Sequence, residues 1–194
     1  MSLRSNLKEL SSASAPSVRL HRLPTNTTTR RHAIHRWFNF IAGFSPELVQ
    51  ACVRLTHRTT QFCLLDPFSG CGTAPLAARL LGISAVAYEP HPFFATISEA
   101  KANSHRYWND IPGIRAAIVR GISQTEAPGI AVSKSASAFL GKMFNSHHLT
   151  SLYAARQELN EDGFGENPLA ILILSRMLDH CCFAATDGIY KAPT

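Results

Sequence analysis

Residues 64–73 read LLDPFSGCGT, and this stretch decides how the chain is expected to fold. Residues 62–65 form a short apolar run, which is typical of a strand buried on both faces. The run ends on Asp66, and Gly70 and Gly72 follow with one residue between them. Because glycine has no Cβ, the backbone there can turn sharply and a ligand can approach it closely. The stretch therefore predicts a strand that leads into a tight binding turn.

The residues after this turn predict a βαβ unit. Thr73 is expected to cap a helix over 74–81, and residues 84–88 read as a second strand. A further helix is expected over 93–105. A strand, a helix and a strand in succession imply a parallel sheet with a right-handed crossover. The sequence thus predicts an α/β fold whose core is a βαβα unit over 62–105.

Two acidic residues mark the ends of the two predicted strands. Asp66 ends the first strand, and Glu89 ends the second strand 23 residues later. In dinucleotide-binding folds an acid about 20 residues beyond the turn accepts hydrogen bonds from ribose hydroxyls. The next helix offers free N–H groups at the same sheet edge. No lysine follows Gly72, which excludes a phosphate loop of the GxxxxGK[ST] type, so we expect a nucleoside with a small or charged attachment.

DPFSGCGT, followed by AYEPHP over 87–92, resembles the first two motifs of class I methyltransferases that use S-adenosylmethionine. The resemblance is strongest to the branch that methylates exocyclic amino groups of DNA, whose motifs are DPFxGxGT and an acid followed by xNP. His91 stands where that branch usually has asparagine. The resemblance implies a Rossmann-like parallel sheet, incomplete in this chain, and S-adenosylmethionine as cofactor.

The resemblance extends upstream and covers roughly residues 30–105. The segment RWFNFIAGFSPELV over 36–49 resembles the part of these enzymes that closes over the methionine end of the cofactor. Ser45 and Pro46 also read, from the residues alone, as the N-cap and first position of a helix. The cofactor-binding residues that the resemblance implies are Asp66, Pro67, Phe68, Ser69, Gly70, Cys71, Gly72, Thr73, Glu89, Pro90, Phe44, Ser45 and Pro46.

The catalytic motif of this branch, [DNS]PP[YFW], is absent, because no PP dipeptide occurs in the chain. Asn167-Pro168 is the nearest imitation, and it reads as an ordinary helix start. None of the five cysteines follows a proline, which disfavours the carbon-5 cytosine methyltransferases. We identify no catalytic residue. The chain is expected to be the N-terminal, cofactor-binding part of a longer or split enzyme, with the catalytic motif in a downstream segment or a separate chain.

Basic charge is concentrated in the N-terminal third. Residues 1–60 hold nine Lys and Arg against two acidic residues, and the remainder holds ten against eleven. We expect a flexible basic arm over 1–29, which either attracts a polyanion or acts as a solubilising tail. Arg30, Arg31, Arg36 and Trp37 are the candidate nucleic-acid-binding residues. The alternative is that Trp37 packs on the core while the arginines are solvated.

The remaining sequence features limit the possible functions and add no candidate binding site. Residues 30–194 are expected to form the cofactor-binding part, with a helical stretch over 139–186 and a buried helix over 167–185. No CxxC occurs, so no zinc site of the common kind is predicted. The longest apolar stretch, 169–174, is too short to span a bilayer, and a soluble cytoplasmic protein is expected.

Three functions remain open on the sequence. The first is part of a DNA amino-methyltransferase that acts on adenine or cytosine. The second, less favoured, is part of an RNA amino-methyltransferase. The third is a non-catalytic module that holds the cofactor or DNA for a partner.

Overall fold

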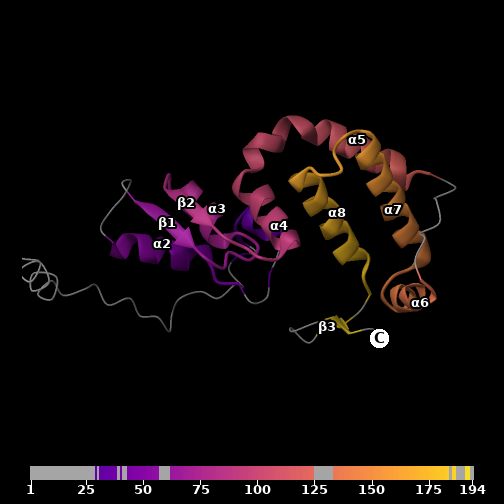
Figure 1. The fold of residues 1–194 in the computed structure, drawn as a ribbon, viewed down its shortest axis with the longest axis horizontal. Coiled ribbons are helices and arrows are strands. Elements are labelled where there is room, and N and C mark those ends of the chain that lie inside the picture. The colour runs from indigo at the N-terminus through magenta and orange to yellow at the C-terminus, as the bar shows by residue number, and fades with distance from the viewer. Residues whose placement is uncertain are drawn as a thin grey trace, which may run out of the picture.

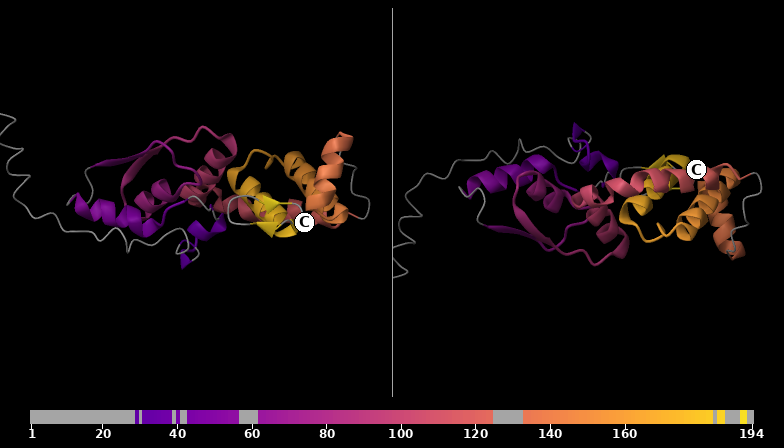
Figure 2. Two further views of the ribbon diagram at one scale, coloured as in Figure 1. Left: turned by 90° about the horizontal axis from the view of Figure 1, so that it is seen from below. Right: turned by 90° about the horizontal axis from the view of Figure 1, so that it is seen from above.

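The computed structural model describes residues 29, 31–38, 40, 43–56, 62–124, 133–183, 185–186 and 191–192. The arm expected over 1–29, apart from Thr29, lies outside the described residues, and so does Arg30. Figures 1 and 2 show an elongated arrangement, with a small sheet at one end and a group of helices at the other. No described helix is long and apolar enough to cross a membrane.

Both predicted strands form, and they are joined by the predicted helix. The elements in chain order are η3 (His35–Trp37), α2 (Pro46–Leu55), β1 (Cys63–Asp66), α3 (Thr73–Leu80), β2 (Ser84–Ala87), α4 (Pro92–Ala102), η4 (Ser104–Asp110), α5 (Ile111–Ile122), α6 (Lys134–Met143), α7 (Ser146–Glu161), α8 (Pro168–Cys181), β3 (Ala185–Thr186) and β4 (Lys191–Ala192). Strands β1 and β2 pair in parallel, from Cys63 opposite Ser84 to Asp66 opposite Ala87. The α/β fold and the βαβ unit are therefore confirmed.

Helices α2 and α3 cover one face of this sheet. Val49 of α2 packs with Ala74 and Ala77 of α3, and Leu64 of β1 lies against them. The start of α2 follows its sequence, because the Oγ of Ser45 accepts a hydrogen bond from the N–H of Leu48 and Pro46 occupies the first turn. The helix caps predicted from Ser45 and Pro46 are confirmed.

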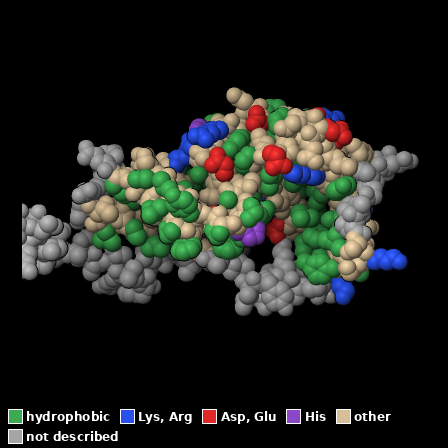
Figure 3. Space-filling view, viewed as in Figure 1, with side chains coloured by type: hydrophobic (Ala, Val, Ile, Leu, Met, Phe, Trp, Pro, Cys, Tyr) green, Lys and Arg blue, Asp and Glu red, His purple; other side chains and the backbone are tan. Residues whose placement is uncertain are grey.

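None of the described elements covers the opposite face of the sheet. Leu65 and Val86 point to this side and are 63% and 44% exposed. Figure 3 shows hydrophobic side chains gathered over the part of the molecule that holds β1 and β2. Parallel sheets normally have both faces covered. Within the described residues no third strand pairs with β1 or β2, so the sheet is a partial Rossmann-like sheet.

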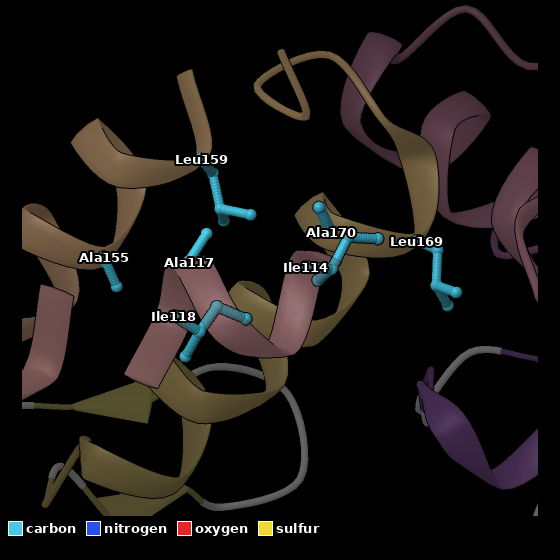
Figure 4. Packing of buried hydrophobic residues seen from close by; sticks show 7 residues of the cluster. All are labelled: Ile114, Ala117, Ile118, Ala155, Leu159, Leu169 and Ala170. Atoms are coloured by element: carbon cyan, nitrogen blue, oxygen red, sulfur yellow. The ribbon is translucent and has the colours of Figure 1, made fainter. Parts of the chain in front are cut away.

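The helical end has its own core, contributed by α5, α7 and α8 (Figure 4). Gly121 allows α5 to approach α7 closely, because a Cβ at this position would lie 2.3 Å from the Cα of Ala155. Helix α8 lies between α4 and α7 (Figure 1), and Leu172 of α8 packs with Ile97 and Ala100 of α4. This contact joins the helical end to the sheet end.

Two helix predictions need correction. Helix α8 ends at Cys181 rather than near 185, and it buries only one side: Leu169 and Leu172 are buried, whereas Leu178 and His180 are exposed. The reason is that the described elements that pack against α8, which are α4, α5 and α7, leave the side with Leu178 and His180 uncovered. The stretch predicted as helical over 139–186 consists of α6, α7 and α8, but residues 185–186 form the short strand β3.

A buried histidine lies on the 3-10 turn η3. His35 is 1% exposed, and neither of its ring nitrogens has a hydrogen-bond partner among the described residues. Burial lowers the pKa of His35 to about 4, and the nearby Lys101 adds to this effect. The ring is therefore neutral in the folded chain at neutral pH.

We expect the stability that depends on His35 to be lost on acidification. The unfolded chain takes up the proton near pH 6.5 and the folded chain only near pH 4, so the free energy of unfolding falls as the pH drops through this window. His35→Phe removes the proton uptake and the unpaired nitrogens, so its free energy of unfolding should rise relative to the wild type between pH 6.5 and 4. Urea titrations across this range test this, with His105→Phe at an exposed position as control; parallel profiles for H35F and wild type would contradict it.

Candidate cofactor-binding site

The DPFSGCGT turn crosses the carboxyl ends of both strands. The N–H of Tyr88 donates to the carbonyl of Asp66 at 2.9 Å, which extends the pairing of β1 and β2 by one residue. The N–H of Ser69 donates back to the carbonyl of Tyr88, also at 2.9 Å. The turn is therefore fixed to the second strand as well as to the first, at the sheet edge where α/β folds bind their ligands.

Glu89 closes the turn from the second strand. Its Oε2 accepts a hydrogen bond from the N–H of Gly70 at 2.8 Å, and its Oε1 accepts one from the N–H of His91 at 2.9 Å. Hydrogen bonds to a carboxylate are stronger than those between neutral groups. Each carboxylate oxygen has a second lone pair, so Glu89 can hold the turn and still accept a hydrogen bond from a ligand hydroxyl.

Asp66 presents an unused acceptor at the same edge. Its Oδ1 accepts a weak hydrogen bond from the N–H of Phe68 at 3.2 Å. Its Oδ2 is buried and has no hydrogen-bond partner among the described residues. Buried polar atoms are nearly always paired, so this oxygen calls for a donor that the described chain does not supply. A ligand ammonium or hydroxyl group would satisfy it.

The two glycines of the turn have different roles. Both have positive φ, +51° at Gly70 and +82° at Gly72. A Cβ at Gly72 would lie 2.5 Å from the Oγ and 2.8 Å from the Cα of Ser98 in α4, so this glycine is required by helix packing. Among the described residues, a Cβ at Gly70 would meet only the ring of Phe40, at 3.9 Å. Gly70 is thus the position with room for an approaching ligand.

Helix α3 begins at the turn without a side-chain cap. Gly72, in the left-handed conformation, is its N-cap, and no described side chain caps the first turn. Thr73, which the sequence suggested as the cap, is instead the first helical residue and is buried. The reason is that the positive φ of the N-cap position favours glycine. The uncapped N-terminus carries the positive end of the helix dipole toward the turn.

A buried lysine lies directly behind the turn. Lys101 of α4 is fully buried, and its Nζ lies 3.6 Å from the Sγ of Cys71 and 3.5 Å from the carbonyl oxygen of Phe38. Burial lowers the pKa of Lys101. The sequence analysis did not select Lys101, although helical spacing places it on the same side as the buried Ile97. Lys101 links the turn, α4 and the segment after η3.

A cavity of about 400 Å³ adjoins the turn on the helix-covered side of β2. Ser69 and Glu89 line it from the turn, and Ala87 of β2 and Ser98 of α4 line it further in. Its size falls in the range of about 300–1,000 Å³ that is usual for small-molecule sites. The turn, Glu89 and this cavity form one continuous candidate site.

The structure brings together most, but not all, of the predicted cofactor residues. Gly70 is hydrogen-bonded to Glu89, and Asp66 accepts a hydrogen bond from Phe68 at the same edge, while Pro67, Phe68 and Pro90 are exposed. Phe44 is 37% exposed, and Ser45 and Pro46 are buried at the start of α2, where Ser45 serves as a helix cap. The ring that faces Gly70 is that of Phe40, which the sequence analysis missed.

The predicted nucleic-acid-binding residues are divided. Arg31 and Arg36 are exposed. Trp37 is half-buried and packs against both the α5–α7–α8 core and the cluster that contains Cys71. Trp37 therefore packs on the core, which is the alternative that the sequence left open. Among the described residues no group of three His, Cys, Asp or Glu could hold a metal ion.

Asn167 has the structural role expected for it. Its Oδ1 caps α8 by accepting hydrogen bonds from the N–H groups of Leu169 and Ala170, at 2.9 and 3.3 Å. Its Nδ2 donates to the Oδ2 of Asp110 at 2.7 Å. Both ends of the amide are thus engaged in the fold, away from the turn.

Comparison with known proteins agrees with this geometry. Residues 34–127 match the family described as RMKL-like, methyltransferase domain. The chain is also 31% identical, over 86 residues, to the Type II methyltransferase M.BsoBI of Geobacillus stearothermophilus. This match covers 44% of the chain and 17% of the length of that relative. No solved structure matches the chain with statistical significance.

We expect Gly72→Ala to destabilise the chain more than Gly82→Ala. Both glycines have positive φ, but a Cβ at Gly82 has nothing within 4 Å, whereas at Gly72 it meets the backbone of α4. Gly82→Ala should cost about 1–2 kcal/mol for the left-handed conformation alone, and Gly72→Ala about 1–3 kcal/mol more for overpacking. Urea denaturation of both variants measures the difference. Equal losses would contradict the close approach of α4 to the turn.

Proposed function

We propose that the chain is the S-adenosylmethionine-binding part of a DNA methyltransferase, because residues 34–127 match a methyltransferase-domain family. The proposed reaction transfers a methyl group to an exocyclic amino group of adenine or cytosine. One observation carries the proposal: the DPFSGCGT turn lies across the ends of two parallel strands and is closed by the carboxylate of Glu89.

The residues at this edge fit S-adenosylmethionine by their chemistry. The cofactor has a ribose diol, an ammonium group and a sulfonium, and it supplies the methyl group when bound. Glu89 has acceptor capacity for the ribose hydroxyls, and the unpaired Oδ2 of Asp66 suits an ammonium or hydroxyl donor. Gly70 leaves the backbone of the turn accessible. Methyltransferases of this family generally use this cofactor.

The proposed acceptor is DNA. The name of the relative, a Type II methyltransferase, supports this, as does the concentration of basic residues in the N-terminal third. Arg31 and Arg36 are exposed and can contact phosphates. Enzymes that modify a base take it out of the stack first, so the acceptor would be an extruded base.

The catalytic motif would come from a partner. The chain contains no [DNS]PP[YFW] motif, and Asn167 is engaged in capping α8. The exposed face of β1 and β2, which includes Leu65 and Val86, supports the docking of further helices there. We propose that these belong to the polypeptide that carries the catalytic motif, either downstream in a longer protein or as a separate chain.

We expect Glu89→Ala to weaken S-adenosylmethionine binding about 10- to 150-fold, which corresponds to about 1.5–3 kcal/mol for hydrogen bonds to a charged group. Glu89→Gln should fall between Glu89→Ala and wild type, because its amide oxygen can still accept from Gly70 but its NH₂ group cannot accept from His91. Isothermal titration calorimetry measures the affinities, with Glu166→Ala as control because that side chain is 95% exposed. An unchanged affinity in Glu89→Ala would place the cofactor site elsewhere.

We also expect the isolated chain to bind S-adenosylmethionine without transferring its methyl group to DNA, because the motif that orients the target amino group is missing. A transfer assay with tritiated cofactor and DNA of mixed sequence tests this beside the calorimetry. Robust transfer by the chain alone would contradict the division into two parts. The absence of both binding and transfer would contradict the proposed function itself.

A further inference from the structure

A second concave surface lies between η3 and α8, apart from the candidate cofactor site. This groove has a volume of about 560 Å³. Its floor contains the buried Leu169 and Leu172, and its walls contain Trp37, Ile173 and Met177. Trp37 and α8 are about 140 positions apart in the chain, so the sequence alone did not predict that they lie close together. The groove is apolar inside and wide enough for a small flat ligand.

The rim of the groove is basic. Arg36 enters from η3, and Arg176 and His180 enter from α8. Of the described residues that line the groove, none is acidic. Asp179 lies next to it and accepts a hydrogen bond from the Nη1 of Arg176 at 2.8 Å. A guanidinium group has five N–H donors, so this pairing fixes the orientation of Arg176 and leaves donors for a ligand.

An occupant of this groove must be flat and apolar in one part and anionic in another. We infer that the groove binds a nucleotide from an unpaired nucleic-acid strand, with the base against Trp37 and the phosphates at Arg36 and Arg176. Stacking on an aromatic side chain accepts any base, and arginine is well suited to phosphate geometry. The inference deepens the proposed function and rests on the nucleic-acid acceptor proposed there.

The position of the groove connects it to the cofactor site. Leu172 in its floor and Trp37 in its wall pack in the same cluster as Cys71 of the glycine turn. The groove and the turn are thus on two sides of one hydrophobic cluster. A strand held at the groove would run close to the part of the molecule that is proposed to hold the methyl donor.

Tryptophan fluorescence tests whether a base occupies the groove. The chain has two tryptophans, and Trp108 is 61% exposed on η4, so Trp108→Phe leaves Trp37 as the reporter. A single-stranded oligodeoxynucleotide should quench the emission of this variant, and the paired duplex of the same sequence should quench it less. Unchanged emission with either probe would overturn the inference. Oligonucleotide binding without quenching, abolished by heparin, would also overturn it, since it would indicate charge attraction alone.

The arginines are tested by the salt dependence of binding. Arg36→Ala and Arg176→Ala should each reduce the slope of log K against log salt by about 0.7, the value for one phosphate contact on a single strand. Arg54→Ala, an exposed arginine on α2, is the matched control and should leave the slope unchanged. Equal slopes in all three variants would overturn the assignment of the phosphate contacts.

Trp37→Leu addresses the stacking directly. It should lower the affinity for the oligonucleotide about 5- to 150-fold, which is the range that 1–3 kcal/mol per stacked base represents. Because Trp37 also packs on the core, the affinity of Trp37→Leu is compared with that of the wild type only if the variant unfolds cooperatively. The salt dependence of the two arginine variants tests the groove independently of Trp37. Quenching without cofactor binding would contradict the proposed function alone, and cofactor binding without quenching would contradict the groove alone.

Discussion

The hydrogen bond from the N–H of Gly70 to the carboxylate of Glu89 holds the candidate site together. Its donor comes from the turn after β1 and its acceptor from the end of β2, so it joins two segments that meet only because the strands are parallel and in register. The bond from Ser69 to the carbonyl of Tyr88 supports it from the backbone. Without this closure the glycine turn would have no fixed position relative to Glu89.

This closure in turn depends on the packing of α4 behind the turn. Gly72 lets Ser98 of α4 approach the turn within contact distance. Lys101, which is also in α4, lies beneath Cys71 of the turn. The amine of the fully buried Lys101 lies near the Phe38 carbonyl and the Cys71 sulfur. The segment after η3, α4 and the turn are therefore one packed unit, and the turn is held from behind as well as from the sheet.

The described helices cover only one face of the sheet. Helices α2 and α3 bury Leu64, whereas Leu65, one residue along β1, is 63% exposed. A parallel strand whose neighbouring residues are both apolar is suited to burial on both faces. The match covers 17% of the length of the Type II methyltransferase relative, and we propose that further polypeptide covers this face. This is the physical basis for proposing that the catalytic part docks there.

Local patterns predicted the elements that carry the turn. The apolar run before Asp66, the glycine spacing and the Ser45-Pro46 helix start each act within a few residues, and all three formed as predicted. The sequence predicted Thr73 rather than Gly72 as the N-cap of α3, because the backbone angle φ of Gly72 cannot be derived from the sequence. The cofactor role of Phe44, Ser45 and Pro46 stays a prediction, since the geometry at these residues is that of a helix start.

Contacts between distant segments could not be predicted in the same way. Phe40 meets Gly70 across 30 positions, and Lys101 meets Cys71 across the same separation. The groove between Trp37 and α8 likewise exists only in the folded chain. The sequence of α8 is apolar nearly all round and predicted a buried helix, but the described elements that pack against it, α4, α5 and α7, leave Leu178 and His180 exposed. Composition predicted its helicity and not the number of its neighbours.

S-adenosylmethionine is proposed to bind at the glycine turn and Glu89. The most direct measurement is a titration of the ¹⁵N-labelled chain with the cofactor, followed by two-dimensional NMR. We expect the largest changes at the amides of Gly70, Cys71 and Glu89, and no change at the amides of α6 and α7. Saturating changes confined to other parts of the chain, or none at all, would contradict it.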